Sequence, residues 1–274
     1  MKKLCIAVLI GLAAFSLPLA AQDKPLNAMS LNGVTGIYVV PTAHIGFSEG
    51  LGLNAGYHTN IFKPLGGDTE MNHLVKANFS FLQMFEVAAA FDFQPEEAQG
   101  ENPNDFLTGI KVQLPFLAIP VALGGNLQYL NIGRDNTDHW AFQVYGAVTY
   151  EADIFTWPAA TTLVAGHTFY ENSESNIDFG MGFDLIVLPK YLRHFLHLLI
   201  DYANFSYSFD PWGAGAWYRG VLNAGLRADL GQIPALNKFT FAVDIYVADA
   251  FDDKDTGRGE GRALGMGVTF GMQF

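Results

Sequence analysis

Charged side chains recur at alternate positions along segments whose other face is apolar. A period of two is typical of β-strands, so these charges point away from the apolar face. If the apolar faces meet lipid, the charged faces line the inside of a barrel, where they form a channel wall or a salt-bridged interior. The predicted lumen-lining charges are Lys76, Glu86, Asp92, Lys111, Asp178, Asp184, Arg219, Arg227, Asp229 and Asp244.

The balance of these charges indicates what such a lumen would favour. Acids exceed bases in the predicted set, and a narrow, low-dielectric channel focuses the field of its wall, so weak cation preference is expected. The whole chain is also acidic, with 27 Asp+Glu against 15 Lys+Arg among 274 residues and a formal net charge of −12. This acidity disfavours nucleic acid as a partner.

Two weaker patterns concern metal binding. Asp253 and Asp255 precede Gly257 in an acidic stretch, a spacing similar to part of a calcium loop. No ligand follows at the twelfth position, so a solvated acidic loop is the favoured interpretation. His194 and His197 would pair on a helix, but their apolar neighbours indicate a turn entering a strand and interfacial polar residues instead of zinc ligands.

Catalysis by a membrane-embedded hydrolase would need a serine, a histidine and an acidic or amide partner near one rim. Single candidates exist at His58, His167 and Ser206, but their spacing does not distinguish them from chance. The sequence therefore predicts neither an enzyme nor a cofactor.

Twelve segments carry the period of two and must position the charges. The final one is the clearest, because Leu264, Met266, Val268, Phe270 and Met272 alternate with glycine, threonine and glutamine. In the ninth segment the alternation slips near Tyr202 and Ala203, which predicts a β-bulge. The predicted strands are 51–58, 75–81, 85–93, 108–114, 121–129, 140–150, 161–170, 177–187, 196–207, 218–227, 239–247 and 264–274; ten to fourteen strands fit the pattern.

The connections between these segments fall into two alternating kinds. One kind is short, apolar and often contains proline, as in 115–120; the other is polar and acidic, as in 95–105 and 249–262. Outer-membrane barrels alternate short periplasmic turns with extracellular loops, whereas a Greek-key sandwich has no reason to sort its loops. The pattern predicts an all-β, transmembrane, antiparallel up-and-down β-barrel.

Both ends of the chain indicate export. Residues 1–21 contain Lys2 and Lys3, an apolar stretch and small residues ending at Ala21, which predicts a signal peptide. The single cysteine, Cys5, lies within it, so no disulfide is expected. The terminal Phe274 resembles the closing signature of outer-membrane barrels, which implies the barrel-assembly machinery as a partner.

Composition supports a membrane location. Half of the residues are hydrophobic and 15% are charged, below the level usual for soluble domains. No later segment reaches the roughly 18 apolar residues of a membrane helix. The outer membrane of a diderm bacterium is the predicted location, with outer-membrane lipid as the surrounding partner.

The segment 22–50 precedes the first predicted strand and carries a distinct motif. Its Gly36, Pro41, Thr42, Ala43 and Gly50 occupy positions that resemble the opening of the YjbH-like family of outer-membrane proteins. The resemblance implies an association with exopolysaccharide secretion. The residues themselves indicate a strand-turn segment in the periplasm or plugging the barrel, with Pro41 ending the pairing because it lacks an N–H donor.

The sequence thus predicts a signal peptide at 1–21, a periplasmic or plug-like segment at 22–50 and a barrel at 51–274. A passive channel or export-associated conduit for small polar or saccharide solutes is the favoured function. The alternative is a surface-exposed structural or adhesive protein without transport activity.

Overall fold

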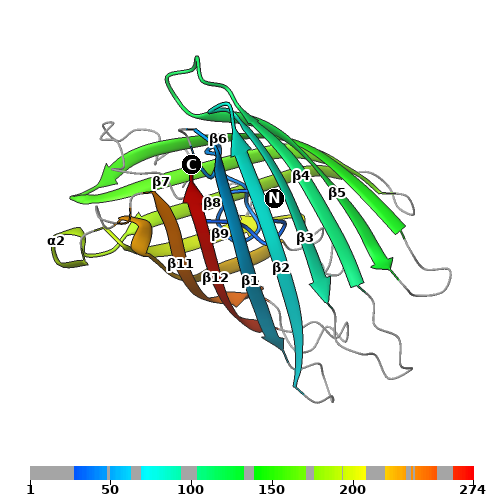
Figure 1. The fold of residues 1–274 in the computed structure, drawn as a ribbon. Helices are drawn as coiled ribbons and strands as arrows, with labels where there is room; N and C mark the ends of the chain where they lie inside the picture. Colours follow the sequence, from blue (N-terminus) through cyan, green and yellow to red (C-terminus); the bar gives the residue numbers. More distant parts are fainter. Residues whose placement is uncertain are drawn as a thin grey trace, which may run out of the picture.

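The computed structural model describes residues 28–47, 50–62, 69–93, 104–132, 139–170, 176–192, 194–207, 220–232, 236, 238–251 and 262–274. Twelve antiparallel strands form one closed barrel (Figure 1). The strands are β1 (Gly52–Phe62), β2 (Glu70–Phe81), β3 (Phe85–Phe93), β4 (Asn104–Gln113), β5 (Val121–Ile132), β6 (His139–Ile154), β7 (Trp157–Tyr170), β8 (Asn176–Ile186), β9 (Leu196–Ala203), β10 (Val221–Asp229), β11 (Phe239–Ala248) and β12 (Ala263–Gln273).

The first and last strands close the barrel. β1 pairs with β12 from Gly52↔Gln273 to Ile61↔Leu264, and every other strand pairs with its neighbours in sequence. Closure leaves no open sheet edge along the wall, which a bilayer requires because it offers no water to satisfy backbone groups. The predicted up-and-down barrel of twelve strands is confirmed.

The outer face of the wall is apolar. Val75, Ile110 and Phe270 are all more than half exposed although they lie in the middle of strands. The residues between such positions point inward, and most of them are small or polar, as are Gly265, Gly267 and Thr269 of β12. An apolar exterior on a closed ladder is the surface of a barrel that spans the outer membrane of a diderm bacterium.

The connections at one end of the barrel are tight. Leu82 and Gln83 between β2 and β3, and Phe155 between β6 and β7, have positive φ angles of 53°, 59° and 59°. The connection between β8 and β9 contains the short helix α2 (Pro189–Leu192), and that after β10 contains the 3₁₀ turn η2 (Leu230–Gln232). No helix among the described residues is long and apolar enough to cross a membrane.

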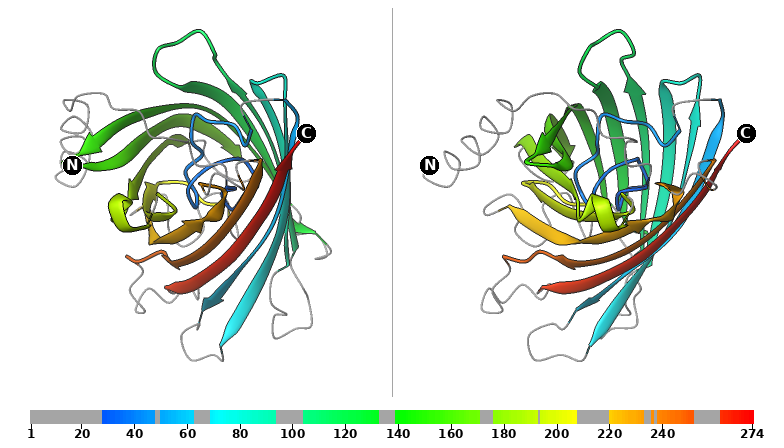
Figure 2. Two further views of the ribbon diagram at one scale, coloured as in Figure 1. Left: turned by 60° about the vertical axis from the view of Figure 1, so that its left-hand side comes forward. Right: turned by 90° about the vertical axis from the view of Figure 1, so that its left-hand side faces the viewer.

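The packed core lies inside the barrel. Residues 28–47, which we call the plug, run through the space enclosed by the strands (Figure 2, blue). Each of these residues is at most 9% exposed, and the buried cluster joins plug residues such as Tyr38 and Val40 to wall residues such as Leu199 and Tyr246. The wall accommodates the plug because many of its inward positions are glycine, alanine or asparagine.

Candidate functional site

The candidate site is the plugged lumen. Nine of the ten charges predicted to line it are buried on the inner face of the wall; Arg219 lies outside the described residues. Each of the nine comes from a strand whose alternate residues face lipid. The nine are Lys76, Glu86, Asp92, Lys111, Asp178, Asp184, Arg227, Asp229 and Asp244.

The plug folds into two successive tight loops. Isolated β-bridges join Met29 to Thr35 and Gly36 to Pro41, so each loop begins and ends on a paired residue. Gly33 turns the first loop with a φ of +91°, a conformation that favours glycine. These loops direct plug backbone groups toward the wall on several sides, so the wall side chains satisfy them.

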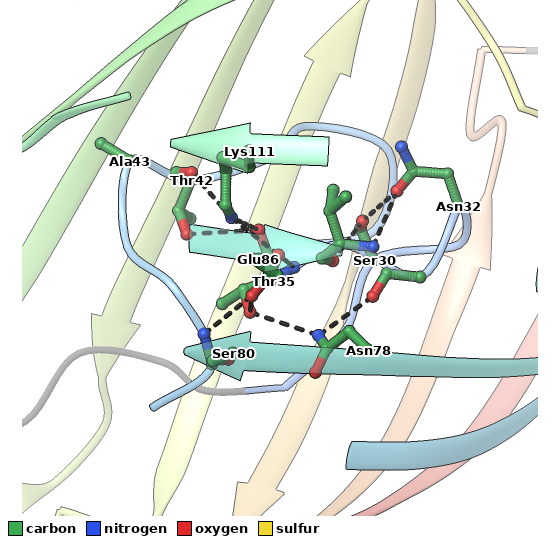
Figure 3. A network of polar contacts seen from close by, with 12 residues as sticks. Ser30, Asn32, Thr35, Thr42, Ala43, Asn78, Ser80, Glu86 and Lys111 are labelled. Carbon is green, nitrogen blue, oxygen red and sulfur yellow. Dashed lines mark hydrogen bonds and ion pairs between the residues drawn. The ribbon is translucent and has the colours of Figure 1, made fainter. Parts of the chain in front are cut away.

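Glu86 on β3 forms the first anchor of the plug (Figure 3). Its carboxylate accepts hydrogen bonds from the Thr35 N–H at 2.7 Å, the Thr35 hydroxyl, and the Gly46 N–H at 2.8 Å. Lys111 on β4 lies 3.3 Å from the same carboxylate and donates to the carbonyl of Thr35 at 2.8 Å and of Thr42 at 3.3 Å. One ion pair thus binds the plug at the end of its first loop, through Thr35, and beyond its second loop, through Thr42 and Gly46.

Asp201 on β9 forms the second anchor. Its Oδ2 accepts three consecutive backbone N–H groups of the plug, from Tyr38 at 2.9 Å, Val39 at 2.6 Å and Val40 at 3.0 Å. Asn223 donates to the other carboxylate oxygen at 2.7 Å. Three successive N–H groups around one anion form a nest, which stabilises the carboxylate without a cation.

Arg227 on β10 forms the third anchor, and it binds carbonyls. Its guanidinium donates to Gly36 O at 3.1 Å and Ile37 O at 3.2 Å, while its Nε donates to Asp244 Oδ1 at 2.6 Å. The Tyr38 ring stacks on Tyr246 with centroids 4.3 Å apart. Burial raises the pKa of the Tyr38 phenol above its usual value, so this ring is neutral.

Further contacts hold the start and end of the plug. Lys76 Nζ donates to Met29 O at 3.0 Å and Ser30 O at 2.7 Å. At the other end, the Ala43 N–H donates to Thr149 Oγ1 at 2.9 Å and the Phe47 N–H donates to Ser80 Oγ at 3.2 Å. The plug is therefore attached to β2, β3, β4, β6, β9 and β10.

A second segment, residues 204–207, also enters the lumen, and its course shows that the predicted β-bulge is wrong. β9 ends at Ala203, and residues 204–207 leave the wall instead of continuing it to Tyr207. The Asn204 side chain ends the strand because it bonds to β8, accepting from the Phe179 N–H at 2.6 Å and donating to Ile177 O at 2.9 Å. Phe205 and Tyr207 are then buried inside.

Tyr207 completes a polar network with the wall. Its hydroxyl donates to Gln143 Oε1 at 2.8 Å and accepts from Asn126 Nδ2 at 2.9 Å. Asp178 belongs to the same network, since Gln143 and Thr168 each donate to its Oδ2 at 2.6 Å. This predicted lumen charge is thus stabilised by one amide and one hydroxyl.

The residues of the N-terminal motif lie at structural positions of the plug. Gly36 and Pro41 close the second loop through their bridge, and Thr42 and Ala43 contribute the backbone contacts to Lys111 and Thr149 described above. Gly50 has a φ of +66° beside the carbonyl of Phe274, where the chain turns from the plug into β1.

Three of the histidine candidates that the structure describes contact carboxylates or an aromatic ring. No group of three His, Cys, Asp or Glu side chains could hold a metal ion within the described part of the chain, and Asp253 and Asp255 lie outside it. His197 faces the lumen and pairs with Asp184 at 2.8 Å, so its predicted interfacial position is wrong. His58 pairs with Asp244 at 3.2 Å, whereas His167 packs edge-on against Phe169.

Asp201 is the functional candidate that the sequence did not predict. It is 1% exposed and carries three plug contacts. The predicted slip around Tyr202 left the face of this strand undecided. Asn204 is the residue that could have placed Asp201 on the inner face. Its side chain ends the strand, and the register through Asp201 is unbroken.

No protein-family model and no curated protein matches the chain. Among solved structures it is similar to a KdgM porin, at 7% identity and a TM-score of 0.48 over 81% of this chain and 99% of that one. It is also similar to Omp33 of Acinetobacter baumannii, at 13% identity and a TM-score of 0.47 over 83% of this chain and 99% of that one. A third similar structure is LpxR of Salmonella typhimurium, at 8% identity and a TM-score of 0.46 over 81% of this chain and 100% of that one. Because these three TM-scores are below 0.5, the functional assignment depends on the geometry of this chain alone.

Proposed function

We propose that the protein is a passive outer-membrane channel for small polar solutes, saccharides among them, and that the plug closes it at rest. The observation that carries this proposal is the chemistry of the plug contacts. Glu86, Lys111, Asp201, Arg227 and Lys76 all bind the plug through hydrogen bonds to its backbone. Water can replace each of these bonds, so withdrawal of the plug exchanges the polar partners of the wall and exposes only the apolar wall residues of the buried cluster, such as Leu199.

The wall that remains after withdrawal suits an aqueous path. Its inward residues include Asn54, Asn78, Asn126 and Thr149 and many glycines. Twelve strands enclose more space than the filled interior of an eight-stranded barrel and less than the channel of a sixteen-stranded porin. The plug occupies the width that a small solute would need.

An engineered disulfide tests the proposal with the full chain. A Cβ built on Gly109 would lie 2.9 Å from Cγ1 of Val34, so the pair Val34→Cys and Gly109→Cys can bridge plug and wall. The only native cysteine, Cys5, lies in the predicted signal peptide. In planar bilayers, the oxidised double variant should show no channel events, and reduction should restore events of wild-type size.

The two single-cysteine variants, treated with the same oxidant, are the matched controls and should conduct like wild type. Closed behaviour of the wild-type protein and of the reduced double variant, with the barrel folded, would contradict the channel.

The filled lumen also favours a second candidate, a surface-exposed structural or adhesive protein. Plug residues Met29, Val34 and Val40 are completely buried, so the resting barrel offers no free path along them. Under this alternative the barrel is an anchor and its outer loops meet the partner. The same conductance measurement separates the two functions, because an anchor shows no events in any redox state.

A further inference from the structure

Lys76 and Asp201 are two lumen charges that the plug backbone compensates. Lys76 Nζ binds the carbonyls of Met29 and Ser30, and Asp201 Oδ2 binds the N–H groups of residues 38–40. The remaining bond of Asp201 is to the neutral amide of Asn223. No ion pair in the described ranges includes either residue.

Other plug-binding charges differ because they form a direct ion pair with an opposite charge on the wall. Lys111 pairs with Glu86 at 3.3 Å, and Arg227 pairs with Asp244 at 2.6 Å. These pairs join adjacent strands and do not depend on the plug. After withdrawal they remain compensated, whereas Lys76 and Asp201 lose all their charge-stabilising plug contacts.

The strand order places these two residues on opposite walls. From β2, which carries Lys76, the closed order passes through β1, β12, β11 and β10 before it reaches β9, which carries Asp201. In the other direction around the barrel, six strands, β3 to β8, lie between them, so β2 and β9 are nearly diametrically opposed. A single stretch of plug, from Met29 to Val40, contacts both side chains, which places them across the same part of the lumen.

We infer that the opened lumen carries a transverse field between Lys76 and Asp201, and that this field selects zwitterionic solutes. The inference rests on the proposed channel function. A solute with separated ammonium and carboxylate groups aligns its dipole with the field and meets both wall charges at once. A neutral solute of the same size gains nothing, and a singly charged solute is attracted by one wall and repelled by the other.

Liposome swelling with full-length protein tests this selectivity. The probes are glycylglycine, a zwitterion, and N-acetylglycinamide, a neutral compound of similar size. Their permeation ratio does not depend on how often the plug withdraws, because both solutes use the same open pore. Wild-type protein should favour glycylglycine by about threefold, the size expected of solvated charge contacts.

Three variants isolate the field. Lys76→Gln and Asp201→Asn should each reduce the ratio toward one. The double exchange Lys76→Asp with Asp201→Lys reverses the field and should retain the preference, since a flexible zwitterion reorients. The control Glu86→Gln with Lys111→Gln also weakens plug contacts, but it removes a compensated pair and should keep the wild-type ratio.

The outcomes distinguish this inference from the channel function. Swelling with both probes at a wild-type ratio near one, or an unchanged ratio in both single variants, overturns the transverse field and leaves the channel. Absence of swelling and conductance in every folded variant overturns the channel, and the field with it.

Discussion

Arg227 and Asp244 form a buried ion pair between adjacent strands, in register across β10 and β11, with Nε to Oδ1 at 2.6 Å. The same guanidinium donates to two plug carbonyls. The pair therefore stiffens the wall and holds the plug at once. Removing Arg227 takes the guanidinium away from the buried Asp244 carboxylate and leaves it the contact with His58 at 3.2 Å, which is costly.

We therefore expect Arg227→Met to destabilise the barrel by about 3 kcal/mol. The measurement is the temperature at which the folded band disappears in semi-native electrophoresis. The control is Lys190→Met, which removes an exposed cation on α2. It should change the free energy of unfolding by less than about 0.5 kcal/mol. Equal midpoints for the two variants would contradict the role of the pair.

The closed ladder predicts heat-modifiable electrophoretic mobility. Every strand of the wall is paired on both sides, so detergent finds no edge from which to unravel it. Unboiled protein should migrate differently from boiled protein and show a β-sheet circular dichroism spectrum. Identical mobility together with a helical spectrum would exclude the barrel.

Labelling on intact cells tests the topology. Phe155 is 99% exposed in the turn between β6 and β7, on the side where both barrel termini lie, and Phe251 is exposed at the opposite end after β11. With both termini in the periplasm, a membrane-impermeant maleimide should label Phe251→Cys and not Phe155→Cys. Labelling of Phe155→Cys alone would reverse the orientation.

Deleting residues 22–40 removes the plug contacts of Asp201, Arg227 and Lys76. Membrane conductance per inserted protein should rise in the deletion variant, because the space now filled by the plug is then always open to water. Folding is checked by heat modifiability. A folded variant with wild-type conductance would show that the plug does not limit the pore.

A substitution at the wall tests plug displacement without deletion. A Cβ on Gly182 would overlap the Ile37 side chain, so Gly182→Val should loosen the plug and increase the frequency of openings. Gly146→Ala is the control, because the nearest atom to its Cβ would be Leu123 Cδ2 at an ordinary 3.7 Å. Equal opening frequencies in the two variants would argue against plug displacement.

Much of the wall was predictable because a transmembrane strand shows its environment in its own sequence. Each residue of β12 faces either lipid or lumen, so the alternation from Leu264 to Met272 determines its orientation. Aspartate or lysine at an inward position follows from the same rule, which is why Asp178 and Lys111 were found.

The parts that escaped prediction depend on contacts distant in sequence. Phe205 and Tyr207 alternate like strand residues, yet their segment leaves the wall because Asn204 bonds to β8. Likewise, the motif around Gly36 indicated a turn but not its partners, which lie up to 191 residues away. Periodicity describes how a strand faces its surroundings and carries no information on where an irregular segment docks.

The plug has a further consequence for the order of assembly. Its contacts with Ser80, Glu86 and Lys111 span 33 to 76 residues of sequence, whereas its contacts with Asp201 and Arg227 span 161 to 191. The seam between Gly52 and Gln273 joins almost the ends of the chain. Because distant contacts are slower to form, we expect the plug to dock first on β2 to β4 and the later strands to form around it before the seam closes.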